Sequence, residues 1–164
     1  SLLLDKGINK DVIYRKVNNS FTSARLQLQG AVLSHMTYLP SYHTAILTLG
    51  KKMQEKLNYH RGDSEGFVNL PLGIKDVIFT CFLREDTERN EIKLSFRSIG
   101  DFPCQEVAKL FGGGGHLNAA GAERIGITLR QAKEEVIDVL GQFKEQLHEA
   151  YRAEQRVSYL LRKS

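Results

Sequence analysis

Four consecutive glycines form the most distinctive segment of the sequence: Gly112, Gly113, Gly114 and Gly115. His116 follows directly, and Asn118 lies two residues further on. Because glycine lacks a Cβ atom, such a run lets several backbone N–H groups approach one bulky anion. An imidazole beside that loop can donate to a phosphate oxygen or act as a general acid near neutral pH. The segment predicts a phosphate-binding loop, with a flexible linker as the alternative.

Neither of the two common nucleotide-binding fingerprints fits this loop. A P-loop needs Lys-Ser or Lys-Thr after its last glycine, whereas His116 and Leu117 occupy those places. The dinucleotide pattern G-x-G-x-x-G also fails, because frames that start at the first and second glycine end on Leu117 and Asn118. These mismatches exclude an ordinary P-loop nucleotidase and a Rossmann dinucleotide site.

A second group of candidate residues lies at the end of an expected strand. Alternation over residues 92–98 places three apolar side chains on one face and three polar ones on the other: Ile92, Leu94 and Phe96, then Lys93, Ser95 and Arg97. A guanidinium binds phosphate through two hydrogen bonds, and the hydroxyl of Ser98 adds a donor. We expect the chain to return the glycine loop beside this strand end, so that both groups share one site. The alternative for Arg97 is a surface position in which it pairs with a carboxylate. The alternative for Asn118 is that it caps the short helix behind it instead of binding ligand.

The elements expected to position these residues make up an α/β domain. We expect strands at residues 44–49, 77–83 and 92–98, a short helix from residue 51 to about 58, and a helix over residues 101–111 capped by Asp101. The small residues Ala119 to Ala122 suggest a helix or turn pressed against other backbone. Thr128 and Gln131 have capping-box spacing and open a long amphipathic helix.

The predicted fold is therefore a small mixed β-sheet flanked by helices, with an N-terminal helical arm and a long C-terminal helix. Residues 1–40 are expected to be a helical connector, and residues 41–164 the domain itself. A chain that opens without Met in the middle of a helical pattern is what a piece of a longer protein shows. The basic residues 152–163 of the last helix are expected to be solvated, with a subunit or nucleic-acid contact as the alternative.

Composition sets limits on the partners and the chemistry. A formal charge of +4 and a pI near 9.1 permit anionic partners without requiring them. No segment approaches the roughly 20 apolar residues of a membrane span, and Cys81 and Cys104 read as reduced packing residues, which together favour a cytoplasmic protein. The histidines are scattered and form no metal-ligand pattern: His35, His43, His60, His116 and His148.

The stretch KLSFRSIGDFPCQEVAKLFGGGGHLNAAGAE, residues 93–123, strongly resembles the C-terminal, DHH-associated domain of the DHH phosphoesterase family. The nanoRNase and phosphoadenosine-phosphate phosphatase branch resembles it most, and SEGFVNLPLGIKDVIFTCFLRED, residues 64–86, fits that branch too. The resemblance covers roughly residues 42 to 150. Arg97 and Ser98 match the family's R-S pair, the four glycines its loop, and His116 the histidine that contacts substrate phosphate.

That resemblance implies a nucleotide-binding domain that closes over a separate N-terminal lobe carrying two manganese ions. No cofactor is expected in this chain itself. The implied activity is manganese-dependent hydrolysis of short oligoribonucleotides or 3'-phosphoadenosine 5'-phosphate, with cyclic dinucleotides and polyphosphate left open. The implied partners are short RNA or nucleotide phosphates and the protein's own catalytic lobe, and a homodimer is a further option. Two alternatives remain: a stand-alone nucleic-acid-binding module, and a dimerisation domain that uses the last helix.

Overall fold

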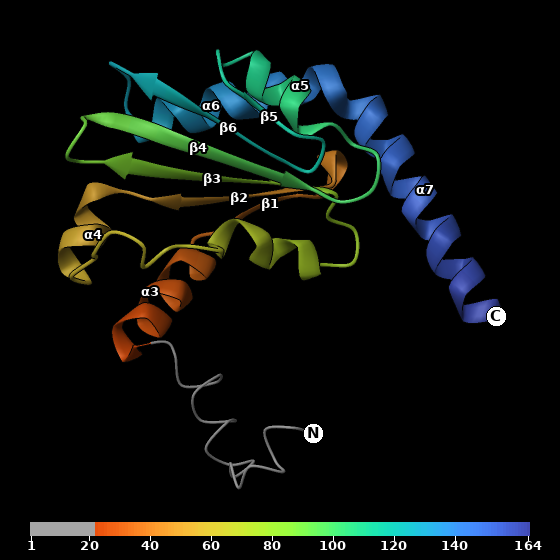
Figure 1. Ribbon diagram of the computed structural model, residues 1–164, viewed down its shortest axis with the longest axis horizontal. Coiled ribbons are helices and arrows are strands. Elements are labelled where there is room, and N and C mark those ends of the chain that lie inside the picture. The colour runs from red at the N-terminus through yellow and green to blue at the C-terminus, as the bar shows by residue number, and fades with distance from the viewer. Residues whose placement is uncertain (1–21) are drawn as a thin grey trace, which may run out of the picture.

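Six strands form one mixed sheet in the part of the chain that the computed structural model describes, residues 22–164 (Figure 1). The strands are β1 (Thr37–Leu39), β2 (Thr44–Leu49), β3 (Phe79–Asp86), β4 (Glu91–Ser98), β5 (Gly114–Gly115) and β6 (Ala119–Ile125). The strands predicted at residues 44–49, 77–83 and 92–98 are confirmed as β2, β3 and β4, although β3 begins and ends slightly later than expected.

The order of the strands brings the segment after the glycine run back beside β4. Neighbours across the sheet follow the order β1-β2-β3-β4-β6-β5. β2 and β3 run parallel, and the other neighbouring pairs of this sheet are antiparallel. A mixed sheet flanked by helices is the α/β fold predicted from the sequence, and it is confirmed.

Helices cover the two faces of the sheet unequally (Figure 1). They are α3 (Ser23–Ser34), α4 (Lys51–Lys56), α5 (Cys104–Lys109), α6 (Leu129–Leu140) and α7 (Lys144–Lys163), with 3-10 turns at Pro40–Tyr42, Phe67–Gly73 and Gly141–Phe143. α5 and α6 lie on one face, which we call the helix-covered face, and α3 lies on the other. α3 covers the β2–β3 part of this second face. We call its remaining part, where β4 presents Lys93, Ser95 and Arg97, the open face.

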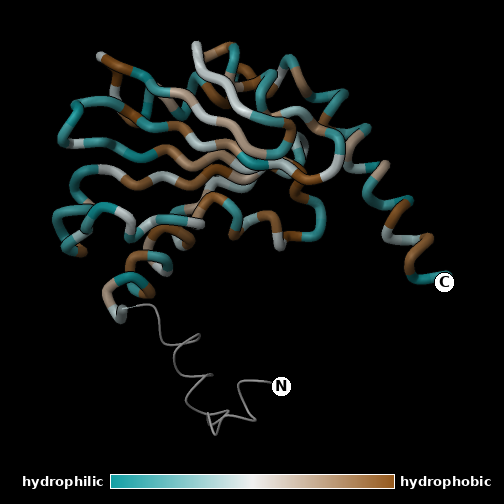
Figure 2. The backbone as a smooth tube through the Cα atoms, in the orientation of Figure 1, coloured by the Kyte–Doolittle hydropathy of each residue, from teal (hydrophilic) through white to brown (hydrophobic). Residues whose placement is uncertain are grey.

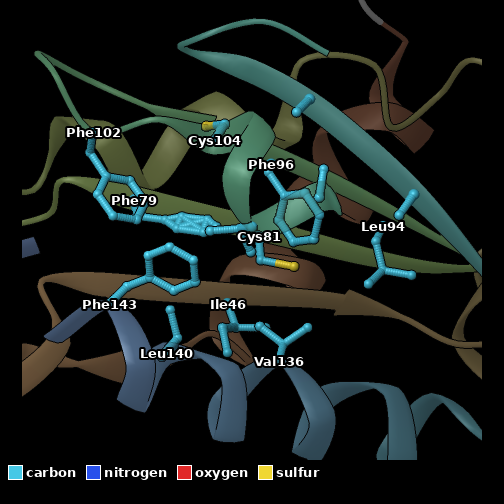
Figure 3. Close-up of a cluster of buried hydrophobic side chains, with 14 of the residues drawn as sticks. Ile46, Phe79, Cys81, Leu94, Phe96, Phe102, Cys104, Val136, Leu140 and Phe143 are labelled. Carbon is cyan, nitrogen blue, oxygen red and sulfur yellow. The ribbon is translucent and has the colours of Figure 1, made fainter. Parts of the chain in front are cut away.

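Two apolar clusters hold these layers together. The larger one joins the strands to α5 and α6, with Ile46, Phe96 and Val136 among its buried members (Figure 3). The smaller one packs Leu28 and Val32 of α3 against β2 and β3. In Figure 2 hydrophobic residues recur along the central strands, and the loops at the strand ends are mostly hydrophilic. β3 is buried on both faces by these clusters, which explains its continuous apolar run.

The long C-terminal helix is confirmed as α7, but it begins at Lys144, and the part expected to be continuous with it from Thr128 is the separate helix α6. The Thr128 hydroxyl accepts from Gln131 N–H while the Gln131 side chain accepts from Thr128 N–H, so the predicted capping box is confirmed. A 3-10 turn at Gly141–Phe143 then separates α6 from α7. α7 extends away from the sheet beyond the ends of the strands (Figure 1), and the residues after Arg156 are all exposed.

Three local predictions are wrong. Residues 37–39, expected to be helical, form β1 because they pair with β2. Residues 119–122 are strand instead of helix or turn. α5 begins at Cys104 after an extended Pro103 and has no side-chain cap, because the Leu117 carbonyl accepts the Cys104 N–H at 2.7 Å. The remaining part of the predicted helical arm, residues 1–21, lies outside the described residues, and the division at residue 40 stays a prediction.

Candidate functional site

Arg97 lies near the end of β4 on the open face. Its neighbours Phe96 and Ser98 are buried, and Arg97 itself is half-buried, as the alternation predicts. One of its terminal nitrogens donates to the Phe96 carbonyl at 2.8 Å. Within residues 22–164 no carboxylate lies in ion-pair range of this guanidinium, so the paired-arginine alternative is not what the structure shows.

His116 lies in the same row of the sheet as Arg97. Arg97 is paired with Ala119 across β4 and β6, and the His116 N–H donates to the Ala119 carbonyl at 2.8 Å on the far side of β6. Two strand spacings separate the histidine from the arginine, which is about 10 Å between backbones. His116 is exposed, and continuing the β5–β6 register places it on the face that carries Arg97. The predicted return of the loop beside the strand end is confirmed.

Ser98 and Asn118 hold the turn that carries His116. Ser98 Oγ is buried, 2.6 Å from the Phe102 carbonyl and 3.2 Å from the Leu117 carbonyl. The Asn118 amide donates to Ser98 Oγ at 2.9 Å and to the Gly100 carbonyl at 3.0 Å. Both side chains are thus engaged inside the protein. Their predicted contact with phosphate stays a prediction, but the structure shows them as the supports of the turn.

The glycine run is not a loop whose N–H groups all point toward one anion, which corrects the cradle expected from sequence. Gly112 and Gly113 close the C-terminus of α5, because their N–H groups donate to the Lys109 and Ala108 carbonyls at 3.1 and 2.9 Å. Gly112 has a φ of 76°, a conformation that favours glycine. Gly114 and Gly115 form edge strand β5.

Glycine is required in this run because β5 lies very close to β6. A Cβ atom on Gly113 would lie 2.1 Å from the Gly121 carbonyl oxygen, and one on Gly115 would lie 2.5 Å from the Ala120 Cα. By contrast, a Cβ atom on Gly114 would meet nothing within 4 Å. The run therefore positions His116 by close backbone packing.

Comparison with known proteins decides the family. A profile for the DHHA1 domain matches residues 41–146, well over half of the chain. The chain belongs to the DHHA1 domain family. The resemblance read from residues 64–86 and 93–123 is thereby confirmed.

Two relatives share substantial sequence with this DHHA1 domain. One is the bifunctional oligoribonuclease and PAP phosphatase NrnA of Thermus thermophilus, 34% identical over 114 residues, which are 70% of this chain and 33% of that protein. The other is the crystal structure of an exopolyphosphatase-related protein from Bacteroides fragilis, 51% identical with a TM-score of 0.78 over 89% of this chain and 42% of that one. The DHHA1 domain thus spans less than half the length of either relative.

A more distant solved structure shares the fold. The pGpG-specific phosphodiesterase PggH of Vibrio cholerae superposes with a TM-score of 0.51 at 11% identity, over 77% of this chain and 40% of that one. At that identity the comparison shows the architecture alone.

No group of three or more His, Cys, Asp or Glu side chains among residues 22–164 of the DHHA1 domain is arranged to hold a metal ion. The family resemblance implies two manganese ions in a separate N-terminal lobe, and that expectation stays a prediction. In the same range, no helix has the length and apolar character needed to cross a bilayer.

The two cysteines of the DHHA1 domain are packing residues. Cys81 and Cys104 are both free and fully buried. Burial raises the pKa of Cys81 well above its ordinary value and raises that of Cys104. Because the thiolate is the nucleophile, neither side chain is poised for catalysis, in agreement with the interpretation from sequence.

Sequence reasoning missed a contact between two histidines that are far apart in the chain. His43 Nε2 lies 3.1 Å from His148 Nδ1, and the His43 ring stacks on Tyr151 at 4.2 Å between centroids. His43 Nδ1 lies 3.0 Å from the Asp76 carbonyl, which fixes that nitrogen as a donor. No spacing in the sequence could have indicated this pair, because it forms only when α7 docks beside the residue that precedes β2.

Proposed function

We propose that this DHHA1 domain binds the phosphate-bearing part of a nucleotide for a manganese-dependent phosphoesterase, whose substrates are short oligoribonucleotides or 3'-phosphoadenosine 5'-phosphate. The row formed by Arg97, Ala119 and His116 on the open face carries this proposal. NrnA, a relative by sequence, is named for activity on oligoribonucleotides and PAP. The chain covers 33% of the length of NrnA, and we propose the activity for a whole protein of which this domain is one part.

The chemistry of the row suits a phosphate. The Arg97 guanidinium presents a planar set of donors that matches two phosphate oxygens. Ala119, whose side chain is a single methyl group, lies between the two functional side chains in this row. His116, held by its backbone on β6, donates from its imidazole to a third oxygen and delivers a proton to the leaving group when protonated. These residues bind and neutralise charge, and manganese would supply the activated water when bound elsewhere in the protein.

Binding by the chain itself tests the proposal. We would titrate it calorimetrically with adenosine 5'-monophosphate, 3'-phosphoadenosine 5'-phosphate and the dinucleotide pApA, and follow the melting temperature in parallel. Each ligand that binds only the folded state must raise the melting temperature with its concentration. Arg97→Ala is expected to weaken every ligand at least about tenfold, and His116→Ala by about three- to tenfold.

The matched control is Arg130→Ala, which removes the same charge from an exposed position on α6. It is expected to leave all three affinities unchanged. Binding that survives both Arg97→Ala and His116→Ala, or that falls equally in Arg130→Ala, would overturn the proposed site.

Assembly through α7 is a second candidate function, and one observation favours it. Val157, Leu160 and Leu161 are at least half exposed and share one side of the helix beyond the edge of the sheet. Sedimentation of the chain over a hundredfold concentration range tests this. A ligand-independent dimer lost in Leu160→Gln supports an assembly role, whereas a monomer at every concentration excludes it.

A further inference from the structure

A groove extends from Arg97 along the open face, away from His116. It lies between the segment 59–66 and strands β3 and β4, and its volume is about 350 Å³. Arg97 lines one part of it, and Lys93 and Arg84 line another. Arg84 is paired with Lys93 across β3 and β4. Lys93 lies four residues before Arg97, which is about 13 Å along β4. The groove thus continues the phosphate row toward the far end of β4.

Basic side chains outnumber acidic ones in this groove. Arg61, Arg84, Lys93 and Arg97 line it, against the single carboxylate of Glu65. An excess of basic over acidic side chains along a groove attracts anions, so a ligand with several negative charges suits this lining.

These four cations differ in how far protein carboxylates already neutralise them. Lys93 Nζ lies 2.8 Å from Glu123 Oε1 and 3.5 Å from Glu91 Oε1. Arg61 lies 3.8 Å from Glu88, and both side chains are more than three-quarters exposed. Over the described residues, no carboxylate lies within ion-pair range of Arg84. Arg84 is therefore the groove cation, besides Arg97, with most capacity left for an external anion.

One wall of the groove is aromatic. Tyr59 lines it, and its hydroxyl lies 3.2 Å from the Ser64 hydroxyl, which limits the rotation of the ring. Val68 and Phe82 form the apolar floor beneath. An aromatic ring beside a cation is the arrangement that single-stranded nucleic-acid sites use, with the base on the ring and the phosphate on the cation.

We propose that this groove holds a second nucleotide of the substrate, with Arg84 and Arg61 at its phosphate and Tyr59 stacked on its base. The inference rests on the proposed function, since Arg97 is shared by the groove and the His116 row. It makes the preferred substrate an oligonucleotide of two or more residues, in preference to a single nucleotide or an inorganic polyphosphate chain.

Ligands of increasing length test this directly. We would measure the affinity of the full chain for adenosine 5'-monophosphate, pApA, pApApA and inorganic tripolyphosphate, with Arg84→Gln, Tyr59→Leu and the control Arg130→Gln. Arg84→Gln is expected to weaken pApA and pApApA about tenfold and to leave the monophosphate unchanged. The slope of log affinity against log salt for pApApA is expected to fall by about 0.7, the loss of one phosphate contact. Tyr59→Leu is expected to weaken pApA and pApApA but not tripolyphosphate.

The outcomes separate the two proposals. Equal loss of all ligands, the monophosphate included, in Arg84→Gln would overturn the second subsite, while Arg97→Ala and His116→Ala still test the first site separately. Loss of tripolyphosphate together with RNA in Arg84→Gln, with no effect of Tyr59→Leu, would show a groove for phosphate alone and overturn the nucleotide assignment. Absence of any binding by the unaltered chain would overturn the proposed function and this inference together.

Discussion

Strand β4 carries Phe96 and Arg97 next to each other in sequence but on opposite faces of the sheet. Phe96 is fully buried on the helix-covered face, 5.6 Å from the Phe79 ring and 6.1 Å from the Phe111 ring between centroids. Arg97 lies on the open face, where it pairs with no carboxylate of the described residues. One strand thus supplies the core with one set of residues and the candidate site with the other, so stability and binding should be separable by mutation.

The largest predicted effect is a loss of folding stability from a substitution on the core face of β4. Phe96→Ala is expected to lower the free energy of unfolding by about 3–5 kcal/mol, because it removes a buried ring and leaves a cavity. Arg97→Ala is expected to change it by less than about 1 kcal/mol while abolishing most nucleotide binding. Urea denaturation of both variants measures the first quantity, and calorimetry the second. A comparable loss of stability in both variants would contradict the division between the faces.

Gly113 and Gly114 allow a similar comparison between a closely packed position and an open one. Gly113→Ala is expected to cost about 1–3 kcal/mol, because its Cβ would lie 2.7 Å from the Ala122 Cβ on the helix-covered side as well as against the Gly121 carbonyl. It should also displace His116 and weaken nucleotide binding. Gly114 is paired with Gly121 on the open face and has space for a methyl group, so Gly114→Ala is the matched control. Equal destabilisation by both changes would show that close packing is not what requires Gly113.

The sequence predicted the helix-covered face better than the glycine segment, for a physical reason. Alternation along residues 92–98 is a local signal, and it correctly separated the core face of β4 from the face that bears Arg97. Strand β6 escaped prediction because Ala119 and Gly121 carry little β propensity and are strand only through pairing with β4. A Cβ on Gly121 would lie 3.0 Å from the Leu94 carbonyl, a constraint that exists only in the folded sheet.

The groove and the histidine pair were missed for a related reason. Arg84 and Arg61 come from segments of ordinary charged composition, and only the packing of residues 59–66 over β3 and β4 brings them together. His43 and His148 meet only because α7 docks beside the residue that precedes β2. Local patterns locate a strand and its faces, whereas tertiary packing decides which side chains share a site.

The smallest predicted effect concerns an ion pair at the rim of the helix-covered face. Arg124 of β6 donates from Nε and from a terminal nitrogen to the two carboxylate oxygens of Glu135 on α6, both at 2.8 Å. Hydrogen bonding from Arg124 lowers the pKa of Glu135 below its ordinary value. A lowered folded-state pKa stabilises the fold above the unfolded pKa of about 4.3, and the stabilisation disappears as the pH falls through the folded pKa.

Glu135→Gln is therefore expected to lose about 0.5–1 kcal/mol at pH 7 and less at pH 3, because pH 3 lies below the unfolded pKa and the contribution of the charge declines there. About a third of each side chain of the pair is exposed, so water and salt screen the attraction and keep the effect small. Glu134→Gln is the matched control, because Glu134 lies 3.8 Å from Arg130 with both side chains mostly exposed, and it should change stability at neither pH. Urea unfolding of both variants at the two pH values measures this. A Glu135→Gln loss that persists undiminished at pH 3 would mean that packing of α6 on β6, and not the charge pair, sets the stability of this rim.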